Sequence, residues 1–405
     1  MRVIIKKFIA IAIFTGVMTF CFTNLFACKA NTKEYLYFTS LKFFNTNFGV
    51  TVFADKNKDG EALERLFYDE LCAVAEQVEN LMSISVEGSD VSRYNRSAVG
   101  EKTQISELTA CVLGQALYYY EKTNGAYNPA VAQLVDLWGF SPRFKDVTIT
   151  AEGKPYDRQK IDGEYDALPD EKYVTAFVSL TDLSDFEIER NGEDYFITKT
   201  CPSVTVDGVE YTQALDLGGI AKGYVVDECV RILRENDYEY GYVNLGSSSL
   251  SLMYYYDTDI MEDGSWKVSV ASPTNRQPII KFKTRGSDVG EGISTSGTYE
   301  NCYFVDGKEY GHIIDPRTGR PTDNGTVSVT VSGGSAMGAD ALTTALCVMD
   351  LDTAIEFIGD ELNGVAIILM RDGEKFKAYS TLEKSEMECS NLISDVQHLS
   401  VMELL

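Results

Sequence analysis

The sequence predicts an α+β protein with a mainly antiparallel sheet, and two patterns in the chain support this prediction. Many short segments alternate apolar and polar residues, as strands with one solvent-facing side do. Glycine-bearing turns lead into helical segments within residues 214–248 and 333–350, and a third distinctive segment lies between them at 292–331. Such a mixture is typical of an α+β architecture, and no repeat of about 20–50 residues indicates a solenoid.

The first 28 residues have the layout of an export signal. A basic start precedes a mostly apolar run at 8–27, which ends at Cys28. The stretch "LFAC" resembles a bacterial lipobox, in which Cys28 would be lipidated and become the mature N-terminus. The alternative is an uncleaved N-terminal anchor. We therefore expect an exported protein attached to the outer face of the cell membrane, with residues 29–42 as a linker.

The charge and the cysteines limit the possible partners and metal sites. A net charge of −25 argues against nucleic acid as a partner, because nucleic acid requires a basic surface. A phosphate-bearing ligand could bind only where a cation, a lysine or a helix N-terminus reverses the field locally. The nine cysteines include no Cys-x-x-Cys pair, so we expect those such as Cys111, Cys229 and Cys347 to be small buried hydrophobic groups.

The part of the chain that follows the linker is predicted to begin with a strand and two helices. The alternating stretch "FFNTNFGVTVFA" predicts a strand near 43–54, and helical spacing of apolar residues predicts helices at 60–82 and 105–122. The stretch at 124–140, "NGAYNPAVAQLVDLWGF", reads as a loop leading into a short apolar helix. Residues 145–170 are charged and irregular, so we expect a surface insertion there before further strands.

The segment "ALDLGGIAKGYVVDECVRILREN", which starts at Ala214, reads as a short apolar strand, a turn at Gly218-Gly219 and a helix. The two glycines allow close approach of a ligand to the backbone, and the helix start offers unpaired N–H groups. The spacing matches neither a Walker A loop nor Gly-x-Gly-x-x-Gly. Lys222 lies in the first helical turn, which is favourable only beside an anion. The alternative is an exposed lysine on a solvated face.

The segment "SGGSAMGADALTTALCVMD" predicts a helix that is capped by Ser335 and ends near residue 349. Asp340 and Thr344 are four residues apart, so their oxygens lie on one face of this helix. A carboxylate, a hydroxyl and nearby carbonyls suit a hard cation such as Mg²⁺. The alternative is that the aspartate only complements the helix dipole and the threonine bonds its own backbone.

The segment "HIIDPRTGRPT" contains His312, one of only two histidines in the chain. Its Gly, Pro and Asp residues predict a turn-rich loop, and a hairpin with Asp306-Gly307 at its turn is expected upstream. His312 could act as a general base or orient a phosphate. The alternative is a histidine that satisfies loop carbonyls.

Seven segments together resemble the FAD:protein FMN transferase (ApbE) family, in the order and approximate spacing of that family. They are "MSISVEGSDVSRYN", "TNGAYNPAVAQLVDLWGF", "LDLGGIAKGYVVD", "GYVNLGS", "STSGTY", "HIIDPRTGRP" and "SAMGADALTTAL". The resemblance covers about 43–380. It implies a T-fold-related antiparallel sheet packed by helices, with a smaller inserted subdomain, in a domain at 43–385 that precedes a C-terminal tail at 386–405.

The resemblance also implies a flavin site built from several loops. FAD would contact nine residues: Asn45, Ser85, Ala126, Tyr127, Asn128, Asp216, Lys222, His312 and Ile313. Mg²⁺ would be held by the Asp340 carboxylate, the Thr344 hydroxyl and the backbone carbonyls of Gly219 and Met337. In catalysis Asp340 would hold the metal and Lys222 would assist it, while His312 would accept a proton.

Family enzymes move the FMN half of FAD to a threonine of an acceptor protein and release AMP. The resemblance therefore implies that the partners are subunits of membrane or extracytoplasmic electron-transfer systems. Three departures from the family pattern concern FAD affinity and acceptor choice more than the fold: Asn45-Thr46-Asn47 replaces Met-Gly-Thr, Asn128 replaces Asp, and Ser247 replaces Gly. Two alternatives stay open, a Mg²⁺-dependent FAD pyrophosphatase that gives FMN and AMP, and a non-catalytic FAD-binding lipoprotein.

Overall fold

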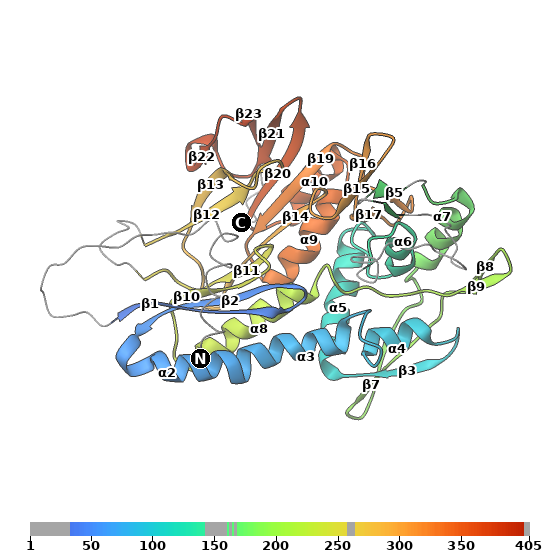
Figure 1. Ribbon diagram of the computed structural model, residues 1–405, viewed down its shortest axis with the longest axis horizontal. Coiled ribbons are helices and arrows are strands. Elements are labelled where there is room, and N and C mark those ends of the chain that lie inside the picture. Colours follow the sequence, from blue (N-terminus) through green and yellow to red (C-terminus); the bar gives the residue numbers. More distant parts are fainter. Residues whose placement is uncertain (1–32, 142–159, 162–163, 166–167, 257–263, 401–405) are drawn as a thin grey trace, which may run out of the picture.

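A nine-stranded sheet forms the centre of the molecule (Figure 1). The computed structural model describes residues 33–141, 160–161, 164–165, 168–256 and 264–400. Neighbouring strands of the sheet are antiparallel except for β21 and β23, which are parallel. In sheet order the strands are β1 (Lys33–Phe43), β2 (Thr46–Asp55), β10 (Gly241–Leu245), β11 (Ser249–Leu252), β14 (Glu291–Gly297), β19 (Thr326–Ser332), β20 (Val365–Asp372), β21 (Lys375–Ser380) and β23 (Ile393–His398). The predicted α+β class is confirmed.

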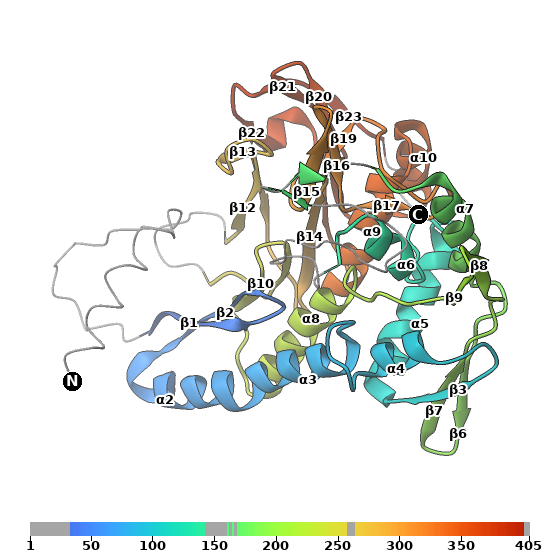
Figure 2. The same ribbon diagram turned by 45° about the vertical axis from the view of Figure 1, so that its right-hand side comes forward.

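Helices cover one face of the sheet, two of them over its middle strands, and further helices lie outside these two (Figures 1 and 2). Helix α8 (Ala221–Glu235) contacts β10 and β11, and α9 (Ala336–Val348) contacts β14 and β19. Helix α2 (Lys56–Leu66) contacts β1 and β2, and α3 (Cys72–Met82) contacts β1 and α8. The outer layer includes α4 (Asp90–Arg96) and α5 (Glu107–Lys122), of which α5 contacts α9, and α10 (Leu351–Glu361) follows α9. Nearly all of α9 is buried, because it packs between the sheet and this outer layer.

A smaller sheet covers part of the opposite face of the main sheet. It consists of β12 (Trp266–Ala271), β13 (Pro278–Thr284) and β22 (Met387–Cys389). Strand β20 lies between two apolar cores, because Ala366 and Ile368 face the helices whereas Ile367 and Leu369 join the core under the smaller sheet. The sheet is therefore buried on both faces at β20.

A separate apolar cluster lies beside the main sheet, on the right in Figure 1. It centres on buried Trp138 and Phe177. The elements around it are α6 (Ala132–Leu137), α7 (Glu171–Val178) with the short 3-10 turn η3 (Ser179–Thr181), and three hairpins: β8–β9 (Val204–Val206, Val209–Tyr211), β15–β16 (Cys302–Val305, Lys308–Gly311) and β17–β18 (Ile314–Asp315, Arg320–Pro321). Strands β3 (Lys102–Ile105), β7 (Asp194–Thr198) and β6 (Ile188–Asn191) form another small sheet, and β4 (Lys160–Ile161) pairs with β5 (Glu164–Tyr165).

Several local predictions are confirmed. The Ser335 hydroxyl accepts a hydrogen bond from the Gly338 N–H at the start of α9. The β15–β16 hairpin turns at Asp306-Gly307, where both residues have positive φ, as a type I′ turn requires. The helix expected at 60–82 begins at Lys56 and contains a π-helical turn, Phe67–Leu71, between α2 and α3.

The expected linker at 29–42 and the expected tail at 386–405 are wrong where the structure describes them. Residues 33–43 form β1, which pairs with β2 through a tight turn at Phe44-Asn45. Residues after 386 supply β22 and β23, and β23 extends the main sheet. The signal at 1–28 and most of the insertion expected at 145–170 lie outside the described residues.

The short strand expected before Gly218 is also wrong, because residues 212–217 have no strand conformation. Hydrogen bonds from side chains, and not from a neighbouring strand, hold this segment. The Asn95 amide donates to the Leu215 carbonyl at 2.9 Å and accepts from the Leu215 N–H at 2.7 Å. The Tyr94 hydroxyl donates to the Gln213 side chain. The segment is thus fixed in an irregular path.

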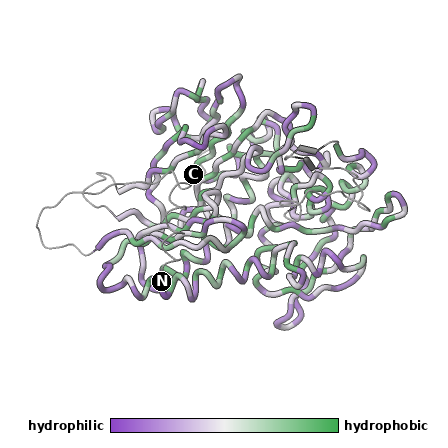
Figure 3. The backbone as a smooth tube through the Cα atoms, in the orientation of Figure 1, coloured by the Kyte–Doolittle hydropathy of each residue, from purple (hydrophilic) through white to green (hydrophobic). Residues whose placement is uncertain are grey.

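Hydrophilic positions gather at the periphery of the chain, and the central segments are mostly apolar (Figure 3). Among the residues that the structure describes, no helix is long and apolar enough to cross a membrane. Cys111, Cys201, Cys229, Cys302, Cys347 and Cys389 form no disulfide. Cys229 and Cys347 are buried as expected, but Cys111 is exposed, because it lies on the outward face of α5.

Replacing Phe48 tests the core between the sheet and the helices. Phe48 is fully buried and stacks on Phe67 with ring centroids 5.6 Å apart. We expect Phe48→Ala to lower the free energy of unfolding by about 3–5 kcal/mol, measured by urea denaturation. The control Phe304→Ala removes a ring that is 43% exposed, and it should change stability by less than about 1 kcal/mol. Equal losses in the two variants would contradict this account of the core.

Candidate functional site

The carboxylate of Asp340 lies where the N-termini of α8 and α9 meet the sheet. One oxygen, Oδ2, accepts a hydrogen bond from the Gly223 N–H at 3.0 Å. The other, Oδ1, accepts from the hydroxyls of Ser249 at 2.8 Å and Ser294 at 2.6 Å. The side chain is buried, so these three donors stabilise a charge that has little access to water.

Helix α8 receives its N-terminal cap from this carboxylate. Ile220 precedes the helix and gives no side-chain cap of its own. Gly223 lies in the first turn, and a methyl group at this position would overlap the Ala336 carbonyl of α9. Glycine therefore permits the close packing that brings the Gly223 N–H to Asp340. Close approach of the backbone was predicted at Gly218-Gly219, and Gly223 was not predicted.

Lys222 points into the same region. Its ammonium donates to the Gly218 carbonyl at 3.0 Å and lies 3.8 Å from Asp340 Oδ2. The side chain is only 24% exposed, so the alternative of a lysine on a solvated face is wrong. The anion that offsets the unfavourable position of Lys222 in the helix dipole is Asp340 itself.

Thr344 and the glycine turn lie together beside Asp340. The Thr344 hydroxyl donates to the Asp340 carbonyl at 3.3 Å, as the alternative interpretation expected. A methyl group on Gly219 would lie 3.5 Å from Thr344 Oγ1 and 3.4 Å from Tyr127 Cε2, so the three residues are neighbours. The hydroxyl oxygen keeps lone pairs after this donation and can still bind a cation.

The oxygens at this position fit a hard cation such as Mg²⁺. Three donors occupy the Asp340 carboxylate, which has about four lone-pair positions, so Oδ2 retains room on the side of Lys222. Met337 and Thr344 are the only residues of α9 that are not buried. Within the described residues no three His, Cys, Asp or Glu side chains form a metal cluster. A cation here would therefore use one carboxylate, the Thr344 hydroxyl and backbone carbonyls, which are the ligand types that Mg²⁺ prefers.

Asp216 and Tyr127 lie next to the glycine turn. Asp216 Oδ1 accepts from the Gly218 N–H at 2.8 Å, and burial raises the pKa of this carboxyl. The Tyr127 hydroxyl is buried and has no hydrogen-bond partner among the described residues. Burial, together with the charges of Asp216 and Asp340, raises the pKa of Tyr127 well above its ordinary value. The hydroxyl therefore stays protonated and can donate to a ligand.

His312 is half-buried, and its Nδ1 is shielded from solvent without a hydrogen-bond partner in the described part of the chain. Burial lowers the pKa of His312 to about 4, and the positive charge of Lys222 acts in the same direction. The imidazole is thus neutral in neutral solution. Neighbouring Ile313 is buried, and its carbonyl accepts from the Thr322 N–H at 2.9 Å.

Four residues that were predicted to contact FAD remain, and two of them are buried while two are exposed. Asn128 is buried, and both ends of its amide bond to backbone, at Thr181 and Ala130. Buried Ala126 precedes Tyr127 in the same loop. Asn45 is exposed at the tip of the β1–β2 turn, and Ser85 is exposed in the turn after α3. Neither hydrogen-bonds to the Asp340 cluster within the described residues, so their role in FAD binding stays a prediction.

Besides Gly223, sequence reasoning missed three residues of the cluster, which are Ser249, Ser294 and Asp227. Ser249 and Ser294 donate to Asp340 from adjacent strands, where they are direct partners in the β11–β14 ladder. Asp227 accepts from two N–H groups at the start of α9. Burial raises the pKa of Asp227 to about 6, against the effect of those two hydrogen bonds. The hydroxyl-rich run at 294–299, which contains Ser294, was the one signal in the sequence for these residues.

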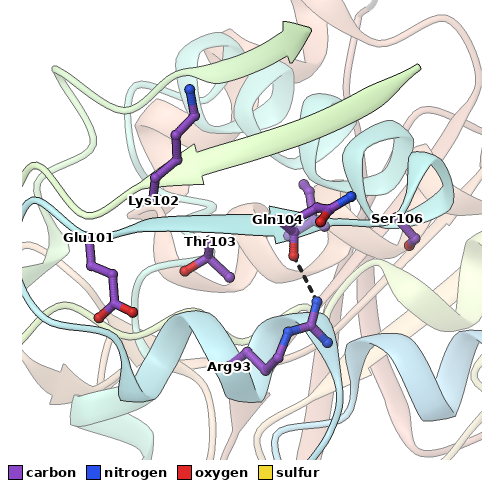
Figure 4. A pocket seen from close by; sticks show the side chains of 7 residues that line it. Arg93, Glu101, Lys102, Thr103, Gln104 and Ser106 are labelled. Atoms are coloured by element: carbon purple, nitrogen blue, oxygen red, sulfur yellow. Dashed lines mark hydrogen bonds between the residues drawn. The ribbon is translucent and has the colours of Figure 1, made fainter. Parts of the chain in front are cut away.

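A depression of about 550 Å³ lies beside strand β3 (Figure 4). Arg93 and residues 101–106 line it, and the Arg93 guanidinium donates to the Gln104 carbonyl at 2.7 Å. None of the predicted site residues is among its lining residues. It is therefore separate from the Asp340 cluster.

Comparison with known proteins agrees with the sequence resemblance. The model of the ApbE family matches residues 44–369. The FAD:protein FMN transferase of Salmonella typhimurium is 30% identical over 302 residues, which cover 74% of this chain and 75% of that protein. The FAD:protein FMN transferase of Vibrio cholerae is 30% identical over 324 residues, covering 80% and 84%.

Solved structures show the same fold. The flavin transferase ApbE from Vibrio cholerae aligns with a TM-score of 0.66 at 26% identity, over 86% of this chain and 97% of that one. The apo form of the Pseudomonas stutzeri flavinyl transferase ApbE aligns with a TM-score of 0.67 at 21% identity, over 87% and 96%. Because the family match spans most of the sequence and the relatives cover about three quarters of it, this chain belongs to the ApbE family.

Proposed function

We propose that this protein transfers the FMN half of FAD to a threonine of an acceptor protein and releases AMP. Membership of a family whose curated relatives are named FAD:protein FMN transferases supports this activity. The observation that carries the proposal is the convergence of Asp340 and Thr344 of α9 with Lys222 and the Gly218-Gly219 turn at the start of α8. Such a site suits a diphosphate and a divalent cation.

The proposed reaction is a phosphoryl transfer. The threonine oxygen attacks the phosphorus on the FMN side of the diphosphate, and the bond from that phosphorus to the bridging oxygen breaks. AMP leaves with the bridging oxygen, and the threonine proton passes to a base. Negative charge grows on the phosphate oxygens during this step, so the site must supply positive charge where the protein as a whole is acidic.

Residues of the chain supply the groups that this step requires. The Lys222 ammonium lies at the start of α8, where the helix N-terminus also favours an anion. Two unit charges about 4 Å apart interact by roughly 4 kcal/mol at an effective dielectric of about 20. The Tyr127 hydroxyl is free to donate to a phosphate oxygen, and the neutral imidazole of His312 can accept the threonine proton.

The proposed metal is Mg²⁺. Asp340, Thr344 and the backbone carbonyls of Gly219 and Met337 would hold it. When bound, it supplies Lewis-acid stabilisation of the diphosphate and of the departing AMP.

The proposed location is outside the cytoplasmic membrane. The basic start, the apolar run and Cys28 support export followed by lipid attachment at Cys28, or retention of an N-terminal anchor. Acceptors would then be threonine-bearing subunits of electron-transfer systems on that side of the membrane.

One experiment separates the proposed transferase from the other candidate activities. The protein is incubated with FAD, Mg²⁺ and an acceptor, and the products are resolved on a denaturing gel and by chromatography. A fluorescent acceptor band with stoichiometric AMP is the expected result. Free FMN with AMP and no labelled acceptor would identify a pyrophosphatase, and intact FAD would identify a binding protein.

Asp340→Asn is expected to lower Mg²⁺-dependent FMN transfer by about 10²- to 10³-fold, because the charge that would hold the cation is lost. Initial rates of acceptor labelling across a Mg²⁺ titration measure this effect. Asp352→Asn, an exposed change on α10, is the control and should leave the rate unchanged. Wild-type rates in Asp340→Asn would remove Asp340 from the metal site.

The stability of the protein should depend on pH through His312. Its pKa is about 4 in the folded protein and 6.5 in the unfolded chain, so the unfolded chain binds the proton more readily. The contribution of His312 to stability is fully present above a pH of about 6.5, and it is lost as the pH falls towards 4. Urea unfolding should show that wild type loses up to roughly 3 kcal/mol more than His312→Asn across this window. Parallel losses in the two proteins would contradict the burial of a neutral imidazole.

Tyr127→Phe should weaken FAD binding by about 3- to 10-fold, since one hydrogen bond from a buried hydroxyl is removed. Calorimetric titration with FAD measures the change. Tyr118→Phe alters a ring that is 50% exposed and should bind FAD as wild type does. Identical affinities for Tyr127→Phe and wild type would show that this hydroxyl does not contact FAD.

A further inference from the structure

Asp227 joins the second turn of α8 to the first turn of α9. Its Oδ1 accepts a hydrogen bond from the Ala336 N–H and its Oδ2 from the Met337 N–H, both at 2.9 Å. A carboxylate that accepts two adjacent N–H groups at a helix start also complements the partial positive charge there. Asp227 lies one helical turn after Gly223, on the same side of α8.

The two helices cap each other. Asp340 of α9 accepts from the Gly223 N–H of α8, and Asp227 of α8 accepts from the first two N–H groups of α9. The Ser335 hydroxyl accepts from the third, that of Gly338. The first three donors of α9 therefore all have partners, and two of those partners are on one side chain from another helix.

Close packing leaves the first turn of α9 little room to move. A methyl group on Gly223 would overlap the Ala336 carbonyl, and one on Gly292 of β14 would overlap the Ala336 N–H. Backbone from α8 and from the sheet thus contacts the same residue from two sides. Within this packing the Asp227 bonds determine how the first turn is oriented.

This orientation bears on the proposed cation site, because Met337 has two roles. Its N–H donates to Asp227, and its carbonyl is one of the proposed ligands. Met337 is also one of only two residues of α9 that are not buried. The Met337 N–H and the Met337 carbonyl lie in successive peptide planes, which the α-helical geometry relates to each other. Fixing the N–H therefore limits the direction of the carbonyl and of Asp340, about one turn later.

We infer that Asp227 is a positioning residue of the proposed Mg²⁺ site, acting through the first turn of α9 without contacting the cation or FAD. The inference rests on the proposed function, since it concerns how that site is aligned. It predicts that this clamp, the two hydrogen bonds from the Ala336 and Met337 N–H groups to Asp227, exists in the metal-free protein. Loss of the clamp should weaken cation binding more than it weakens the fold.

The test uses the full chain and its Asp227→Asn variant, in which one of the two acceptor oxygens becomes a donor. Hydrogen exchange of the metal-free proteins reports the clamp, and the expected result is faster exchange at Ala336 and Met337. Electron paramagnetic resonance measures the binding of Mn²⁺, a paramagnetic substitute for Mg²⁺, to each protein in the presence of FAD. The expected increase in its dissociation constant is about 10- to 100-fold.

Asp350→Ala is the matched control, because the Asp350 carboxylate caps α10 by accepting from the Thr353 N–H at 3.0 Å. It should accelerate exchange at Thr353 and leave Mn²⁺ affinity unchanged. Asp227→Ala, which removes both acceptors, is the second variant and should weaken Mn²⁺ binding at least as much as Asp227→Asn. A melting temperature for each variant separates loss of binding from loss of folding.

Three results would overturn the inference. Wild-type Mn²⁺ affinity in Asp227→Asn and Asp227→Ala would exclude a positioning role while leaving the proposed function intact. Failure of both variants to fold, with Asp350→Ala folded, would assign Asp227 to stability alone. Absence of Mn²⁺ binding and of FMN transfer in the wild-type chain would overturn both the inference and the proposed function.

Discussion

The buried carboxylate of Asp340 is the constraint on which the rest of the site depends. It receives hydrogen bonds from the start of α8, from β11 and from β14, so it joins two layers of the fold at one point. Without it the Gly223 N–H and the Ser249 hydroxyl would be left unpaired in buried positions, whereas the Ser294 hydroxyl would keep the Ser248 carbonyl as an acceptor. The helices are thereby held to the sheet by the same group that faces Lys222. Structure and proposed chemistry therefore share one side chain, and that side chain cannot be moved without disturbing both.

An acidic protein can bind a diphosphate only where the local field differs from that of the whole surface. In the proposed site the Lys222 ammonium, the N-terminus of α8 and the proposed cation would supply this difference. Two nearby groups are kept uncharged by burial: Tyr127 retains its proton, and His312 lacks one. The Tyr127 hydroxyl can donate a hydrogen bond, and the His312 imidazole can accept a proton. Burial thus assigns different tasks to titratable groups around one cluster, through the single physical effect of removing them from water.

Reciprocal capping depends on two helices approaching with backbone in contact. Gly223 and Gly292 lie against Ala336 from opposite sides, so neither position has space for a larger residue. This packing explains why α9 is buried almost throughout and yet leaves Met337 and Thr344 accessible. A helix buried on every side except one is a rigid support for ligands on that side. The family match at 44–369 extends over this whole arrangement.

Features that depend on near neighbours in the chain could be predicted from the sequence. The Ser335 cap, the Asp306-Gly307 turn, the placement of Asp340 and Thr344 on one helix face and the position of Lys222 all follow from spacing and local geometry. Tertiary structure alone decided the pairings over long separations. Gly223 and Asp340 are 117 residues apart, and Asp227 and Ala336 are 109 apart. For the same reason the sequence did not reveal that residues 33–43 join the sheet or that residues 212–217 lack a strand partner. Local patterns limit the backbone of a segment, but only the packed fold determines which distant groups satisfy its hydrogen bonds.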